Sequence, residues 1–306
     1  MTNIRFMAWR NVALITSLTL VLASVVLLAW RGLNFGLDFT GGTLVEIGFQ
    51  APVDPEAVRR HLDASGVREA VVQQFGTDRE LLVRVPPQRD TEQSKLGDQV
   101  FERVAAEFDG ATLRQSSFVG PAVGEELAED GGLALLASVA VILIYILFRF
   151  AKQFAFGAVI ALVHDVLITL GFFAAFQWTF DLPALAAVLA VIGYSLNDTI
   201  VVADRIRENV RRIRKGTIPE IIDLSLNQTL DRTLSTSGTT LFVLVALLIF
   251  GGESVRGFAD ALTIGIVVGT YSSIYVAAAL LILMNIRRED LVVVEKEQEQ
   301  QDSEYP

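Results

Sequence analysis

Six long apolar blocks constrain the fold of this chain more than any other feature. The blocks lie near residues 11–30, 131–148, 154–176, 183–203, 236–250 and 258–285. A transmembrane helix needs about 20 mostly apolar residues, so the blocks predict six membrane-spanning helices. The composition agrees, because hydrophobic residues make up 52% of the 306 residues and the mean hydropathy is +0.48. A purely soluble enzyme is therefore excluded.

Two properties of the whole chain exclude further classes of protein. The absence of cysteine rules out disulfides, thiol nucleophiles, iron–sulfur clusters and thiolate zinc sites. The net charge of −10 argues against a nucleic-acid binder. Neither a metal site nor a cofactor site is expected, since we find no metal-ligand cluster and no phosphate-type glycine loop in the outer segment.

Basic residues gather at alternate ends of the apolar blocks and predict the topology. These residues are Arg5, Arg10, Arg149, Lys152, Arg205, Arg207, Arg211, Arg212, Arg214, Lys215, Arg287 and Arg288. By the positive-inside rule these ends are cytoplasmic. The chain is therefore expected in the cytoplasmic membrane, with both termini on the cytoplasmic side. The first block is interpreted as an anchor and not as a cleaved signal peptide, because the run from Val12 to Trp30 is longer than a usual signal core.

The charge pattern and the apolar blocks together divide the chain into successive regions. The expected regions are a cytoplasmic N-terminus at 1–10, a first transmembrane helix at 11–30, an extracytoplasmic domain at 31–130, transmembrane helices two to six within 131–285 with a basic cytoplasmic loop at about 204–232, and an acidic cytoplasmic tail at 286–306.

The segment between the first two helices has the pattern of a small α+β domain. Short runs rich in apolar and β-branched residues predict strands, and Asp54-Pro55 is a typical helix start. The expected elements are strands at 43–49, 70–75, 81–85 and 111–119 and helices at about 54–65 and 91–108. This βαββαβ order predicts a ferredoxin-like fold. His61 is expected to be a plain surface residue of the first of these helices.

Ionisable residues inside the apolar blocks are the candidates for function, because a charge at the bilayer centre is costly. Asp198 in the fourth block is the foremost of them, and Tyr194 is its neighbour one helical turn away. Asn197 and Ser195 can be explained by hydrogen bonding between helices. Asp198 is interpreted as a proton or ion carrier, with a structural ion pair as the alternative.

Two further polar sites lie within the helices. The fifth helix has a polar face that is expected to point into the bundle, where Arg232 could reach Asp198; the alternative is that Arg232 extends to the cytoplasmic interface. The members of that face are Arg232, Ser235, Thr236, Thr239 and Thr240. In the third helix, His164 and Asp165 are either part of a proton relay or a structural pair.

Several long motifs in a fixed order resemble the SecD/SecF family of protein-export membrane subunits, which belongs to the resistance–nodulation–division superfamily. The matching motifs are residues 35–42, which contain the signature residues Asp38, Gly41 and Gly42; residues 191–202 around Asp198; residues 204–209, which begin Asp204-Arg205 and include Arg207; His164-Asp165; and residues 232–240. The resemblance extends over the whole chain to about residue 288. One departure is Ala203, where a phenylalanine is common.

The resemblance implies a transport subunit and not an enzyme. With SecD, it would use the proton motive force to promote late steps of preprotein export through the SecYEG channel, with YajC and YidC as further partners. It places Asp198 and Arg232, with Asn197 and Tyr194 beside them, in the proton pathway, and it puts Asp204, Arg205 and Arg207 at the cytoplasmic interface. The alternatives are a non-conducting scaffold subunit of the complex, or half of a proton-driven small-molecule exporter.

Overall fold

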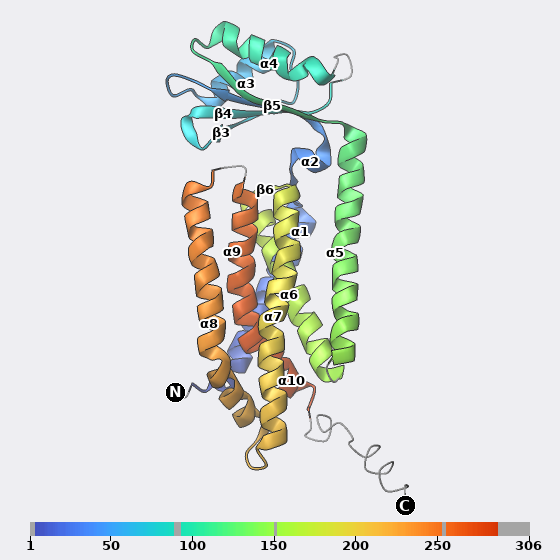
Figure 1. The fold of residues 1–306 in the computed structure, drawn as a ribbon. Helices are drawn as coiled ribbons and strands as arrows, with labels where there is room; N and C mark the ends of the chain where they lie inside the picture. Colours follow the sequence, from blue (N-terminus) through green and yellow to red (C-terminus); the bar gives the residue numbers. More distant parts are fainter. Residues whose placement is uncertain (1–3, 89–92, 150–151, 253–254, 287–306) are drawn as a thin grey trace, which may run out of the picture.

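The computed structural model describes residues 4–88, 93–149, 152–252 and 255–286, and it has two parts. A bundle of long helices forms the lower part of Figure 1, and a small α+β domain lies above one end of it. Three predicted features fall outside the described residues. They are the first two residues of the helix expected at 91–108, the basic pair Arg287 and Arg288, and nearly all of the acidic tail.

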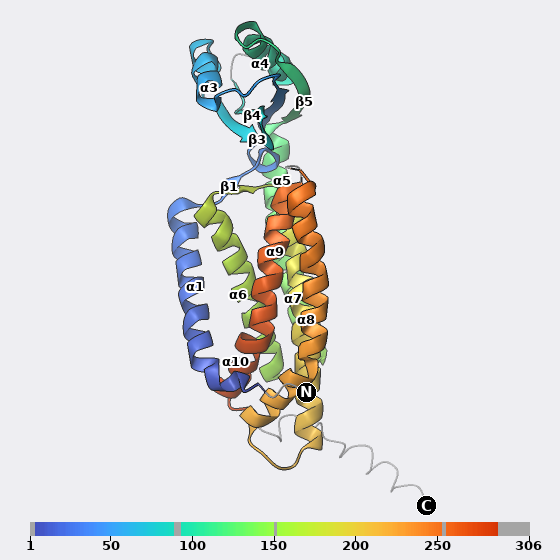
Figure 2. The same ribbon diagram turned by 90° about the vertical axis from the view of Figure 1, so that its left-hand side faces the viewer.

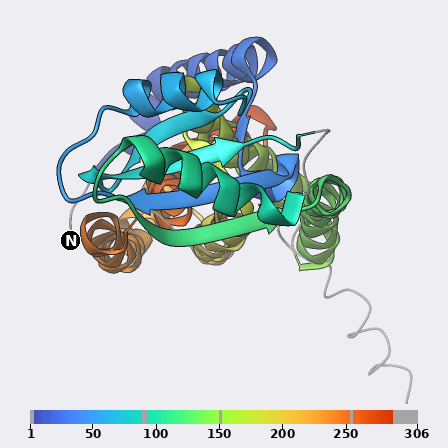
Figure 3. The ribbon, with the colours of Figure 1, turned by 90° about the horizontal axis from the view of Figure 1, so that it is seen from above.

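The upper part, which we call the head domain (residues 42–119), has the ferredoxin-like arrangement that the sequence predicts. Its sheet has the order β3-β4-β2-β5, and all three pairings are antiparallel. The elements are β2 (Gly42–Gly48), α3 (Pro55–Ala64), β3 (Val71–Phe75), β4 (Thr77–Val85), α4 (Gln93–Glu107) and β5 (Thr112–Val119). The two helices cover the face of the sheet that points away from the bundle (Figures 1 and 3).

Local sequence signals explain how the head domain folds. The Asp54 side chain accepts a hydrogen bond from the Glu56 backbone at 3.1 Å and caps α3, with Pro55 in the first turn. The core between helices and sheet is apolar and includes Ile47, Leu62 and Val100. His61 is half-buried and not a plain surface residue, because its Nε2 lies 2.9 Å from the Arg103 carbonyl oxygen of α4.

Within the described residues, the lower part contains six helices long and apolar enough to cross a membrane, as the sequence predicts. They are η1 with α1 (Phe6–Trp9 and Arg10–Arg31), α5 (Pro121–Arg149), α6 (Lys152–Phe176), α7 (Leu182–Arg212), α8 (Ile218–Phe250), and α9 (Arg256–Tyr271) continued by η3 (Ser272–Ala277) and α10 (Ala278–Leu283). Buried residues are concentrated on α6, α7 and α9, whereas α1, α5 and α8 present many exposed apolar side chains.

Three of the spans extend well beyond their apolar blocks. α5 starts at Pro121, so its first turns rise above the block that begins near residue 131. The basic stretch expected as a loop at about 204–232 is largely helical, because α7 continues to Arg212 and α8 starts at Ile218. Charged residues can continue a helix once it has left the membrane, and the Thr217/Glu220 capping box starts α8.

A short connection joins the two parts of the molecule. β1 (Asn34–Phe35) pairs in parallel with β6 (Thr179–Phe180), which precedes α7, and the four-residue helix α2 (Leu37–Thr40) leads into the head domain. Figure 2 shows β1 lying between the bundle and the head. The signature segment is therefore part of the junction and not of the head domain alone.

Candidate functional site in the helical bundle

The candidate site lies where α7 and α9 pack closely against each other. Gly265 and Gly269 on α9 allow the approach, because a Cβ added at Gly269 would lie 3.0 Å from the Ser195 Cβ of α7. Small residues at this spacing let helix backbones come together in membranes. Polar groups from four helices are thereby brought into the centre of the bundle.

Asp165 on α6 forms the first polar cluster of this site. Its side chain is fully buried, and its Oδ2 accepts hydrogen bonds from Ser195 Oγ at 2.5 Å and Ser272 Oγ at 2.7 Å. Its Oδ1 lies 2.8 Å from His164 Nδ1. His164 is also buried, and its Nε2 has no hydrogen-bond partner among the described residues. The carboxylate of Asp165 is thus well satisfied, whereas the imidazole is only partly so.

Asp198 on α7 forms the second polar site. It is 3% exposed, and its Oδ2 is buried without a hydrogen-bond partner in the described part of the chain. The polar groups that act on it are the Ser237 hydroxyl and the Arg232 guanidinium, both from α8. Ser237 Oγ lies 2.7 Å from Thr270 Oγ1 on α9. A buried carboxylate with an unsatisfied oxygen is an energetically costly group.

The two sites are adjacent along the helices that they share. Ser195 and Asp198 are separated by one turn on α7, and Thr270 near the end of α9 lies close to Ser272 at the start of η3. Each carboxylate therefore has its own hydroxyl partners, Ser195 and Ser272 for Asp165 and Ser237 for Asp198, and the two groups lie on neighbouring turns of the bundle.

The predicted polar face of α8 points into the bundle only in part. Thr236 and Thr240 are half-buried, whereas Arg232, Ser235 and Thr239 are exposed, and the buried polar side chains of this stretch are Thr233 and Ser237. The reason is the helical period, because the face that packs against α7 and α9 is rotated away from the face defined by Arg232. Arg232 still acts electrostatically on Asp198 from the edge of the bundle.

Tyr194 and Asn197 occupy different positions around Asp198. Tyr194 is half-buried, and its hydroxyl lies 3.4 Å from Thr240 Oγ1 on α8. Asn197 is exposed on the outer side of α7, as is Gly193 one turn before it. The structure therefore brings Asp198 and Tyr194 towards α8 and leaves Asn197 facing away from the bundle.

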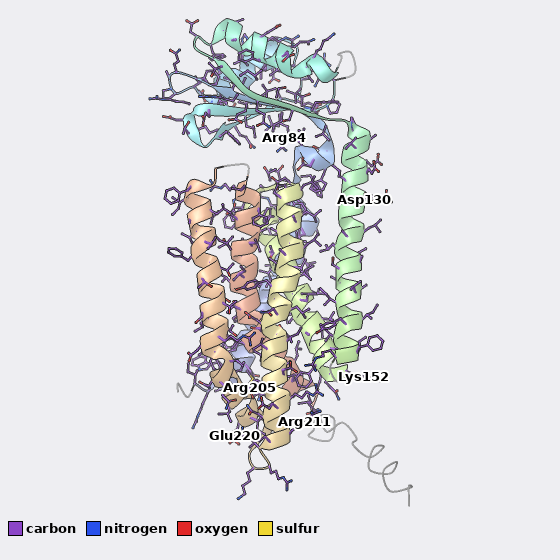
Figure 4. The ribbon with its side chains drawn as sticks, viewed as in Figure 1. Arg84, Asp130, Lys152, Arg205, Arg211 and Glu220 are labelled. Atoms are coloured by element: carbon purple, nitrogen blue, oxygen red, sulfur yellow. The ribbon has the colours of Figure 1, made fainter. Side chains whose placement is uncertain are left out.

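The predicted interface residues gather at the end of the bundle opposite the head domain. Asp204 forms an ion pair with Arg149 at 3.2 Å, and Arg205 pairs with Glu208 at 2.8 Å. Figure 4 shows Arg205, Arg211, Glu220 and Lys152 at this lower end, and Arg84 near the head. Arg207 lies beside Arg149 and Asp204 in a shallow hollow.

The signature residues Asp38, Gly41 and Gly42 lie at the junction and not near Asp198. Gly41 and Gly42 have φ values of 67° and 122°, a region that favours glycine. A Cβ at Gly42 would lie 2.6 Å from the Val85 carbonyl oxygen. These glycines therefore let the chain turn sharply and pack against the head domain.

Several residues of the site were not predicted from the sequence. They are Ser272 and Thr270 on the last span and Ser237 on α8. A cluster of small polar residues inside the sixth apolar block, residues 269–273, was the available signal. The π-helix at Ser272–Ala277 was also unforeseen, and such segments often occur at functional sites. Within the described ranges, no group of three or more His, Asp or Glu side chains could hold a metal ion.

Comparison with known proteins identifies the family. The family described as "Protein export membrane protein SecD/SecF, C-terminal" matches residues 100–287, and the "SecD/SecF GG Motif" matches residues 26–53. The chain is 51% identical over 298 residues to the protein translocase subunit SecF of Vibrio alginolyticus, covering 97% of this chain and 95% of the relative. It is 49% identical over 294 residues to that of Pseudomonas aeruginosa, covering 95% and 94% of the two chains.

A solved structure has the same architecture. The chain superposes on the crystal structure of SecDF, a translocon-associated membrane protein from Thermus thermophilus, with a TM-score of 0.85 and 40% identity over 94% of its length. It spans 39% of the length of that SecDF chain. A second SecDF structure, in a form called super-membrane-facing, gives a TM-score of 0.70 at 38% identity, covering 100% of this chain and 40% of that one. The chain therefore belongs to the SecD/SecF family of protein translocase subunits, as a SecF-type member.

Proposed function

We propose that this SecF-type subunit, a multi-pass transport protein and not an enzyme, works with SecD to couple the proton motive force to late steps of preprotein export across the cytoplasmic membrane. The observation that carries the proposal is the buried Asp198 carboxylate, one oxygen of which lacks a hydrogen-bond donor among the described residues. An ionisable group inside a membrane bundle is by default a functional group.

The arrangement of charges supports an orientation with the head domain outside the cytoplasm. Lys152, Arg205 and Arg211 lie at the end of the bundle away from the head (Figure 4), and basic residues favour the cytoplasmic side. The N-terminal end of the described chain lies at the same end of the bundle as the α7–α8 connection (Figure 1). Both termini are then cytoplasmic, and the head faces the compartment into which preproteins emerge.

The chemistry of Asp198 supports a proton-carrying role. A proton that arrives from the head side binds the free Oδ2 and neutralises the carboxylate, and a neutral carboxyl is less costly to bury. Neutralisation also removes its attraction to Arg232, whose guanidinium keeps its own proton. Release of the proton on the cytoplasmic side restores the charge. Each proton that crosses 100 mV supplies about 2.3 kcal/mol, which is enough to bias a domain between two states.

The exposed polar groups of α7 and α8 support SecD as the membrane partner. Arg232, Ser235 and Asn197 lie on surfaces that would otherwise contact lipid. Polar groups at such a surface are costly unless another helix satisfies them. The solved SecDF chain, of which this chain spans 39%, is long enough to contain a second set of helices. We therefore place SecD against α7 and α8, next to Asp198.

The other partners rest on the family alone. SecYEG, YajC, YidC and the translocating preprotein are proposed because the chain is SecF-like. His164 and Asp165 are proposed as a structural pair that positions α6, α7 and α9, because the carboxylate of Asp165 is already satisfied by Ser195 and Ser272. A relay role is the alternative that mutation can test.

The function is tested in inverted membrane vesicles that lack their own SecF-type subunit and receive this chain together with SecD. The completion of preprotein export is measured after ATP-driven insertion, with a proton gradient, with a sodium gradient and with neither. We expect this chain to stimulate completion only with the proton gradient. Equal stimulation without any gradient would contradict coupling and support a scaffold, and stimulation by the sodium gradient alone would assign a different ion.

A further inference from the structure

The short helix α2 contacts three parts of the molecule at the junction. The Gly36 backbone N–H donates to the Phe180 carbonyl oxygen at 2.8 Å, which continues the β1–β6 pairing. The rings of Phe39 and Phe180 stack with centroids 6.0 Å apart. On the other side, a Cβ added at Gly124 of α5 would lie 2.9 Å from the Phe39 carbonyl oxygen. Residues 36–41 therefore pack against α5, the segment that leads into α7, and the head domain.

Asp38 of α2 holds the outer end of α7. Its Oδ2 accepts a hydrogen bond from the backbone N–H of Leu182, the first residue of that helix, at 2.9 Å. Asp181 caps the same helix from within the chain, since its Oδ1 accepts from Ala184 N at 2.8 Å. The first N–H groups of a helix have no intrahelical acceptor, and the helix dipole favours negative charge there. Asp38 is thus a cap supplied by a segment 144 positions away in sequence.

An arginine of the head domain completes this junction. Arg84 on β4 donates from Nη1 to the Phe35 carbonyl oxygen at 3.1 Å, and it interacts electrostatically with Asp181 and Asp38. Burial lowers the pKa of the Arg84 guanidinium and raises the pKa of the Asp181 carboxyl, so the cluster is partly shielded from water. Figure 4 shows Arg84 on the side of the sheet that faces the bundle.

Two glycines bring the backbone segments of the junction close together. A Cβ at Gly36 would lie 3.0 Å from the Asp181 Cβ, and one at Gly41 would lie 2.9 Å from the Pro121 Cα. From Leu182 to Asp198 the chain is one uninterrupted helix, which spans about 24 Å at 1.5 Å per residue. A displacement of α7 at Asp198 is therefore transmitted to its outer end.

We propose that Asp38 is a positioning residue that clamps the outer end of α7 to the head domain, so that movement of the helix carrying Asp198 becomes movement of the head. This inference rests on the proposed proton-coupled function. In this proposal the signature segment couples the proton site to the domain outside the membrane. The Asp38 hydrogen bond adds a non-covalent link to the two covalent connections between head and bundle, which run through residues 32–41 and residue 120.

The test removes the same hydrogen bond from each of its two sides. Asp38→Ala deletes the acceptor. Leu182→Pro deletes the N–H donor at a helix position that tolerates proline, and Asp181 before it is already extended, with φ −112° and ψ −178°. Leu182→Ala keeps the donor and is the matched control, and Asp109→Ala removes an exposed carboxylate of the head domain. Each variant is assembled with SecD, and the amount of complex is measured.

Two quantities are measured on vesicles holding equal amounts of complex: proton influx with a pH-sensitive dye, and the rate of proton-driven preprotein export. We expect both bond-deleting variants to retain influx while export falls to the level seen without a proton gradient. Both controls should keep influx and export. Asp38→Asn, which retains an acceptor oxygen, should recover part of the export.

Other outcomes separate the two proposals. If influx and export fall together in the assembled bond-deleting variants, or if neither falls, Asp38 is not a coupling residue. If the unmutated complex shows no proton influx, the proposed function itself fails, whatever the variants do. If only Asp38→Ala fails to assemble, Leu182→Pro with its alanine control still decides the question.

Discussion

Asp165 and Asp198 are two buried carboxylates of one bundle, and they differ in how completely their oxygens are satisfied. Two serine hydroxyls donate to Asp165, and the His164 imidazole lies beside it. Asp198 has one oxygen without a partner among the described residues. A fully satisfied buried polar group fixes a structure, whereas a partly satisfied one is costly and can be changed by a proton. The difference supports our proposal that Asp165 serves packing and that Asp198 exchanges protons.

The largest expected effect separates the two carboxylates by function. Asp198→Asn removes the titratable group with little change in volume, so proton-driven export should fall to the rate measured without a proton gradient. The measurement is export in membrane vesicles that contain equal amounts of assembled complex. Asp204→Asn is the matched control, because Asp204 is half-exposed and pairs with Arg149. Normal proton-driven export by Asp198→Asn would remove it from the pathway.

Asp165→Asn should affect stability more than the proton step. The amide replaces one of the two acceptor oxygens of the carboxylate by an NH2 group, which weakens the contacts with the two serines and the imidazole, and a buried polar group left unsatisfied costs about 1–3 kcal/mol. Thermal unfolding of the purified complex in detergent measures this loss. We expect the complex that does assemble to export normally. A variant of normal stability that no longer takes up protons would instead place His164 and Asp165 in the relay.

The close approach of α7 and α9 can be tested through its glycine. Gly269→Ala adds a methyl group against Ser195 and should destabilise the bundle by about 1–3 kcal/mol, the usual cost of overpacking. Gly132→Ala on α5 is the control, because a Cβ there meets nothing within 4 Å. Both are helical glycines, so they share the gain in helix propensity. Equal melting temperatures for the two variants would show that the contact is not tight.

The serine pair at the start of the π-helix offers a finer comparison. Ser272→Ala removes a donor to the Asp165 carboxylate and should cost about 1.5 kcal/mol, the value for a hydrogen bond to a charged group. Ser273→Ala removes only a bond to the Thr270 carbonyl oxygen at 3.0 Å and should cost less. Both side chains are fully buried, so the difference between their unfolding free energies isolates the carboxylate contact. A larger loss for Ser273→Ala would contradict it.

The smallest effect is expected at Tyr194. Its hydroxyl lies 3.4 Å from Thr240 Oγ1, which is long for a hydrogen bond, so Tyr194→Phe should change stability by less than about 0.5 kcal/mol. The same preparation gives the export rate, which should remain near normal. A strong fall in proton-driven export at unchanged stability would show that the hydroxyl takes part in proton transfer beside Asp198.

Helices and candidate carboxylates were predictable because each depends on local properties of the chain. Apolar blocks define the six spans, and an aspartate inside such a block is conspicuous in the sequence. The partners of Asp165 were not predictable, because Ser195 and Ser272 come from helices 30 and 107 positions away. The direction of the polar face on α8 was partly misjudged for the same reason, since one helix does not reveal which neighbours it packs against.

Six membrane-spanning helices, a ferredoxin-like domain between the first two of them, and Asp198 as the principal ionisable candidate could all be predicted from the sequence alone. The packing of the helices was needed to show which carboxylate is satisfied, that Arg232 is exposed, and that Asp38 caps a helix far along the chain. The physical reason is the distance along the chain over which each interaction acts. Hydrophobicity and helix propensity act over a few turns, whereas hydrogen bonds between buried side chains depend on how distant helices are rotated and packed.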